Sequence, residues 1–147
     1  MMDPRTYSLI ADIIRRESRS LLQYVGESYP SITPDQQNTW SQIRKMIGEE
    51  LQGMANLMRL LQRRHEPPPY LGSYPSSFTS LSFVSLDHLI PLLAAHERED
   101  LERLEREIGV IADPEVDELV QTIIETKRRH LEALQSLAAK NPQPAVA

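Results

Sequence analysis

Five ionisable side chains fall on the apolar faces of amphipathic segments: Glu17, Glu50, Glu97, Lys127 and His130. When the chain is advanced by about 100° per residue, each lies within a stripe of isoleucine, leucine, valine and methionine that should be buried. A lone buried charge is very costly, so such groups must pair with one another, with a metal ion, or with both. The pattern therefore predicts a polar site inside the protein.

The segments that carry these residues predict four helices, at about 5–29, 34–65, 85–109 and 114–140. Three of them begin at a capping residue followed by proline, in Asp3-Pro4, Thr33-Pro34 and Asp113-Pro114. No alternating strand pattern competes with them. We therefore expect an all-α fold with one domain over residues 1–140, followed by a frayed tail at 141–147.

The lengths of the connections predict how the helices are arranged. The links at 30–33 and 109–113 are short, so helices 1 and 2, and helices 3 and 4, should form antiparallel hairpins. The middle link, 66–84, can extend over roughly 60 Å, whereas the second helix is roughly 48 Å long. This link is therefore expected to be a crossover along the bundle, and its four aromatic residues should pack on the bundle or in a dimer contact.

Such an arrangement also predicts that the five ionisable residues share one layer of the core. Glu17 should lie one turn from Glu50, and Glu97 should lie beside Lys127 and one turn from His130. Glu17 and Glu50 are separated along the chain by as many residues as Glu97 and His130. Three carboxyl groups, an amine and an imidazole should therefore converge between the helices.

Over residues 5–140 this pattern resembles the ferritin-like superfamily, most closely the rubrerythrin and erythrin type of di-iron carboxylate protein. The resemblance implies two antiparallel hairpins joined by a long crossover. It also implies a metal pair held by a glutamate from the first and third helices and a Glu-x-x-His from the second and fourth. At the matching positions, Glu17, Glu50, Glu97 and His130 would be the candidate metal ligands.

Two positions depart from that pattern. Gly53 stands where the histidine of the second helix is expected, and Lys127 stands where the bridging glutamate of the fourth helix is expected. A protonated lysine repels metal cations and pairs with the remaining acids. These departures argue against a normal di-iron centre.

Two functional interpretations follow. The first is a non-catalytic ferritin-like bundle without a cofactor, in which Lys127 is the internal counter-ion of a degenerate site and the role is structural or protein-interaction. The second is one Fe, Mn or Zn ion held by Glu17, Glu50, Glu97 and His130, with oxidase or peroxidase chemistry. A buried lysine can become neutral, so Lys127 leaves this alternative open. A four-helix bundle of unrelated origin also stays open.

The composition limits the other functional classes. The 147-residue chain has a net charge of −5 and no cysteine, which argues against general affinity for nucleic acid or anionic membranes and excludes disulfides and thiolate zinc sites. No apolar run approaches the length of a membrane span, and the start of the chain lacks a signal-peptide pattern. We therefore expect a cytoplasmic protein, and a structural or protein-interaction role predicts a homodimer or higher homo-oligomer. Whether His96 or Glu97 faces the core stays open.

Overall fold

The computed structural model describes residues 2–140, and this part of the chain is helical without a β-strand. The α-helices are α1 (Pro4–Ser18), α2 (Leu21–Glu27), α3 (Gln37–Arg63), α4 (Leu86–Glu107) and α5 (Pro114–Lys140), and the short 3₁₀ helices are η1 (Pro34–Gln36), η2 (Ser76–Leu81) and η3 (Ile108–Val110). The predicted all-α class is confirmed. The tail predicted at 141–147 lies outside the described residues. Over 2–140, no helix combines the length and apolar character that crossing a membrane requires.

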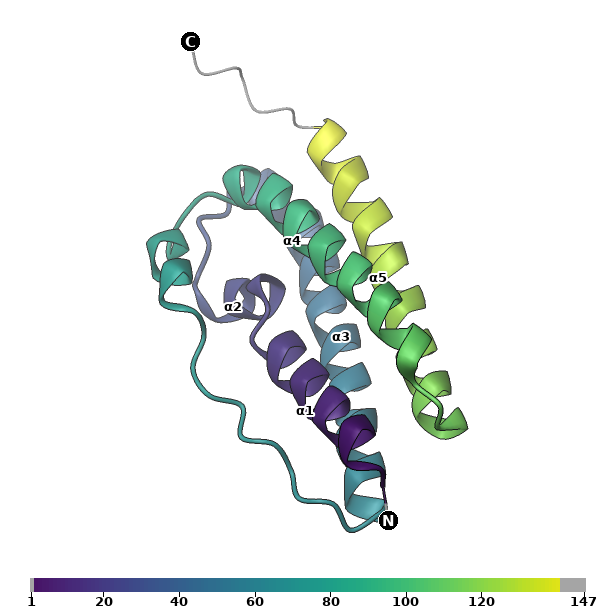
Figure 1. Cartoon of the computed structure of the whole chain (residues 1–147). Coiled ribbons are helices and arrows are strands. Elements are labelled where there is room, and N and C mark those ends of the chain that lie inside the picture. Colours follow the sequence, from purple (N-terminus) through teal and green to yellow (C-terminus); the bar gives the residue numbers. More distant parts are fainter. Residues whose placement is uncertain (1, 141–147) are drawn as a thin grey trace.

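The long helices pack side by side into a bundle (Figure 1). α1 lies against α3, α3 against α5, and α4 against α5. Within the pair α1 and α3 the chain reverses direction, and it reverses again between α4 and α5. The segment 66–84 runs back along the outside of the bundle from the end of α3 to the start of α4, so α3 and α4 point the same way.

The helix predicted at 5–29 is broken in two, which corrects the expectation of one continuous first helix. α1 ends at Ser18, and the hydroxyl of Ser20 accepts a hydrogen bond from the backbone N–H of Gln23 at 3.2 Å, which caps the start of α2. Serine competes for backbone groups in this way and is a strong helix start. α2 therefore leaves the line of α1 (Figure 1) and packs against both α3 and α4.

The crossover is held to the bundle at several points along its length. Tyr7 donates its hydroxyl to the carbonyl of Pro67 at 2.8 Å, and Arg19 donates to the carbonyl of Gly72 at 2.8 Å. Farther along, η2 places Phe78 in the core. The expectation that its aromatic residues pack on the bundle therefore holds for Phe78, whereas Tyr70 is 85% exposed.

The apolar core consists of two separate clusters of buried side chains. One contains Ile13, Leu57, Leu104 and Val120, and the other contains Leu22, Ile43, Leu89 and Leu134. Along the chain, buried ionisable residues stand between the members of the two clusters: Glu17 between those of α1 and α2, Glu50 within α3, Glu97 within α4, and Lys127 and His130 within α5. A polar layer therefore divides the core.

Candidate functional site

The five ionisable residues predicted to converge do converge, in the polar layer between the two apolar clusters. Glu17, Glu50, Glu97, Lys127 and His130 are all buried, none more than 7% exposed. They come from four helices whose apolar faces point to a common axis, which is why one layer can collect them. We call this group, together with Asp100 at its edge, the ion cluster.

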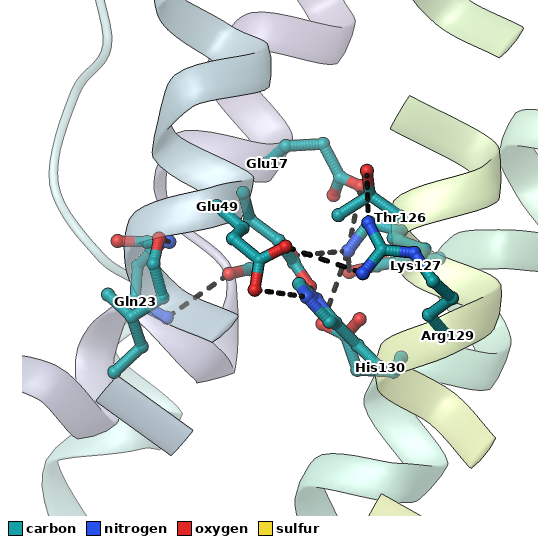
Figure 2. Close-up of polar contacts among 12 residues, drawn as sticks. Glu17, Gln23, Glu49, Thr126, Lys127, Arg129 and His130 are labelled. Atoms are coloured by element: carbon teal, nitrogen blue, oxygen red, sulfur yellow. Dashed lines mark hydrogen bonds and ion pairs between the residues drawn. The ribbon is translucent and has the colours of Figure 1, made fainter. Parts of the chain in front are cut away.

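Lys127 is at the centre of the ion cluster, and Figure 2 shows it between Glu17 and His130. Its Nζ lies 2.8 Å from Glu50 Oε1, 3.2 Å from Glu97 Oε1 and 3.2 Å from Glu17 Oε1, with Asp100 Oδ2 at 3.8 Å. The ammonium donates hydrogen bonds to Glu50 and Glu97, whereas its approach to Glu17 is an ion pair without hydrogen-bond geometry. One ammonium group therefore lies within ion-pair distance of four carboxyl groups.

His130 joins the ion cluster through Glu50. Its Nδ1 lies 2.7 Å from Glu50 Oε2, and because a carboxylate only accepts, the imidazole nitrogen is the donor. On its other side, His130 Nε2 lies 3.7 Å from Glu49 Oε1, and Arg129 approaches the same carboxyl group at 3.4 Å (Figure 2). Glu49 thus extends the network to the surface.

Glu49 belongs to this network but is not among the five residues that the apolar stripes predict for the site. Its side chain is 33% exposed and reaches His130 from the edge of the buried layer. The position of Glu49 on its helix therefore did not indicate a buried ionisable residue. The open choice between His96 and Glu97 is settled for Glu97, which is 1% exposed. His96 turns instead toward the crossover and meets the ring of Phe78 edge-on, with 5.8 Å between centroids.

The charges of the ion cluster are strongly perturbed by burial and by one another. Burial would lower the pKa of Lys127, but the surrounding carboxylates raise it well above its usual range, so the amine is held as ammonium. Burial would raise the pKa of Glu50, but Lys127 and the hydrogen bond from His130 lower it to about 2. Glu50 is therefore the carboxylate most firmly ionised in the cluster.

The other two buried carboxyl groups shift in the opposite direction. Burial raises the pKa of Glu17 to about 7, because the attraction of Lys127 only partly offsets burial and the repulsion from Asp100 and Glu50. Burial likewise raises the pKa of Glu97 well above its usual range, opposed by Lys127 and reinforced by the charge of Glu50. Three chemically identical side chains thus hold protons differently within one layer.

A cavity of about 200 Å³ opens between α3 and α5 and reaches the ion cluster. Glu17, Glu50 and Lys127 line its inner part, and Gly53, Met54 and Ile123 line its sides. A Cβ atom at Gly53 would lie 3.0 Å from Ile123 Cγ1, so a larger residue at position 53 would have to displace α5 side chains. The position at which the resemblance implies a histidine therefore forms part of this cavity.

The residues present do not fit a di-iron pair. Glu50, Glu97 and His130 offer ligand atoms within 4.8 Å of one another, as a metal site requires. The ammonium of Lys127, however, already donates to two of these carboxylates, and no imidazole reaches the cluster from position 53. A pair of cations in this layer would face a fixed positive charge where a bridging carboxylate is needed.

Comparison of the chain with protein-family models, with curated proteins and with solved structures finds no match.

Proposed function

We propose that this protein is a ferritin-like bundle of the rubrerythrin type in which a lysine-centred ion cluster replaces the di-iron centre, and that it is non-catalytic. Two features support the proposal. The chain forms two reversing helix pairs linked by a crossover of 66–84 along the bundle. Four of the positions implied by the resemblance, Glu17, Glu50, Glu97 and His130, lie in one buried layer.

The observation that carries the proposal is the position of the Lys127 ammonium. Its Nζ lies within 3.2 Å of one oxygen from each of Glu17, Glu50 and Glu97. In a carboxylate-bridged metal site, cations neutralise the acids that the helices contribute. Here a covalently attached cation does so, which lets the same acidic layer persist without a metal.

A bundle of this kind would act as a structural or protein-interaction module, and we propose that it does so as a cytoplasmic homodimer or higher homo-oligomer. One end of the bundle offers apolar surface for such a contact. Tyr29 and Phe83 are 79% and 72% exposed and stack on each other with 6.5 Å between ring centroids. Exposed aromatic side chains of this size are enriched in protein interfaces.

The test is metal analysis of protein purified without added metal, read beside Lys127→Glu. The substitution restores a bridging carboxylate and removes the internal cation, so we expect wild type free of Fe, Mn and Zn and the variant loaded with one of them. Lys45→Glu makes the same charge change at an exposed position on α3 and should stay metal-free. Stoichiometric metal in the wild type would contradict the proposal.

The second candidate function is a single Fe, Mn or Zn ion in the same layer, with oxidase or peroxidase chemistry. The cluster of ligand atoms from Glu50, Glu97 and His130 favours it, since oxygen and imidazole ligands suit these metals. The ammonium of Lys127 opposes it, because its pKa is raised rather than lowered. Metal bound to wild type and lost in His130→Ala would support this alternative over the first.

A further inference from the structure

The cavity between α3 and α5 contains a carboxyl group that no part of the described chain satisfies. Glu17 is 2% exposed, lines the cavity, and neither of its side-chain oxygens accepts a hydrogen bond from any donor in residues 2–140. Its ion pair with Lys127 engages one oxygen only, at 3.2 Å. Buried polar atoms are nearly always hydrogen-bonded, so a donor from outside the chain is expected here.

The shape and lining of the cavity indicate what that donor carries. Its side walls include the apolar side chains of Met54, Leu119 and Ile123, and its rim carries Thr122 and other polar residues. With a volume of about 200 Å³ it is larger than a single ordered water needs. A molecule with a short apolar body and one polar end fits these walls.

The charges that line the cavity indicate which polar group the ligand carries. Three carboxyl groups, those of Glu17, Glu49 and Glu50, line the cavity beside the single ammonium of Lys127. A carboxylate is an acceptor, and its strongest partner is a charged donor. A protonated amine supplies several N–H donors and offsets the excess of acids, whereas a carboxylate or phosphate would meet the acids with like charge.

We propose that this cavity is a binding site for a small primary amine, whose ammonium group is held by Glu17 and whose short hydrocarbon body lies against Met54, Leu119 and Ile123. The site requires only Glu17 and the cavity. It therefore does not depend on a ferritin-like origin, and it can fail while the metal prediction succeeds, or the reverse.

The experiment is a titration of isotopically labelled full-length protein with n-butylamine, followed by amide NMR at fixed ionic strength and at a fixed pH above 7, where Glu17 is ionised. We expect saturable shifts centred on Gly53, Thr122 and Thr126, which line the cavity. n-Butanol should bind about tenfold more weakly, because a charge-assisted hydrogen bond is roughly twice as strong as a neutral one. Butyrate should not bind, and ethylamine should lose about fourfold in affinity per missing methylene.

Two variants separate the head group from the body of the ligand. Glu17→Gln keeps the size of the side chain but removes its charge, so amine affinity should fall by about tenfold or more. Thr122→Phe closes the rim from an exposed position on α5 without touching the ion cluster, and it should abolish the shifts. Gln121→Phe and Glu125→Gln are the matched controls, because both positions are exposed on α5 and outside the cavity lining.

The proposal is overturned if n-butylamine produces no saturable shifts in wild type, which would mean that the cavity holds solvent only. It is also overturned if butylamine and butanol bind equally, or if Glu17→Gln binds the amine as wild type does. Because Thr122 and Gln121 are exposed, loss of binding in Thr122→Phe together with full binding in Gln121→Phe would place the ligand in this cavity rather than elsewhere on α5.

Discussion

Two of the multi-residue ion networks within residues 2–140 differ in burial. Around Lys127 the side chains are almost wholly inside, with Lys127 itself 1% exposed. At the far end of α3, Arg64 pairs with Asp113 and with Glu115 across the loop that starts α5, and the Arg64 and Asp113 side chains are 27% and 22% exposed. Both networks join a cation to more than one carboxylate, but only the network around Lys127 is buried away from solvent.

Because the two networks differ in burial, they should contribute differently to stability. The Arg64 network forms at the surface, where desolvation costs little and the gain is small. The Lys127 network required several charges to be desolvated, and apolar side chains of similar size often give equal or greater stability. Two apolar clusters already flank it. Stability alone therefore does not account for the Lys127 network.

The largest expected effect comes from removing the central cation. Lys127→Met leaves the carboxyl groups of Glu17, Glu50 and Glu97 without their counter-ion, and breaking a buried pair by deleting one partner costs about 3–5 kcal/mol. Urea unfolding at neutral pH measures the loss, with Lys45→Met as the exposed control. A change as small as that of the control would mean that the ammonium is not the counter-ion of this layer.

A second effect is the pH dependence that Glu17 imposes. Its pKa rises from 4.5 to about 7 on folding, so the folded state binds the proton more tightly. The associated stability is fully present below pH 4.5 and is lost as pH rises through about 7. The difference amounts to about 3 kcal/mol at most.

Glu17→Gln should abolish that loss. The free energy of unfolding of the variant, relative to that of wild type, should therefore increase as pH rises from about 4.5 to about 7. Glu50 has the opposite sign, because its pKa falls to about 2 and its contribution is lost on acidification. Glu50→Gln is therefore the control with a separate pH window: its stability relative to wild type should decline as pH rises from about 2 to 4.5 and stay level from 4.5 to about 7. Parallel curves for wild type and Glu17→Gln would contradict the assigned pKa shift.

The core position of the ion cluster was predictable because a charged residue in an apolar helical stripe is visible in sequence. Each of Glu17, Glu50, Glu97, Lys127 and His130 interrupts such a stripe, and proline and capping residues fixed the helix starts well enough to align their heights. That alignment needs only helical period and loop length, so the convergence followed without any match to a known protein.

The remaining features depend on tertiary contacts that periodicity does not encode. The break before α2 arises because the hydroxyl of Ser20 caps a new helix, and serine is equally compatible with a continuous one. The contact of Glu49 with His130 depends on the reach of a half-exposed side chain. The cavity depends on how closely α3 approaches α5 at Gly53. None of these has a periodic signature.

The smallest expected effect is at the exposed network. Arg64→Gln removes its hydrogen bonds to Asp113 and Glu115, and should lower stability by about 1 kcal/mol or less, with most of the difference disappearing in high salt. Asp113→Asn isolates the charge, because Asp113 Oδ1 also accepts from the backbone N–H groups of Glu115 and Val116 at the start of α5 and asparagine keeps that cap. Urea unfolding of both variants at low and high salt measures the effect. A salt-independent loss as large as that of Lys127→Met would erase the contrast between the two networks.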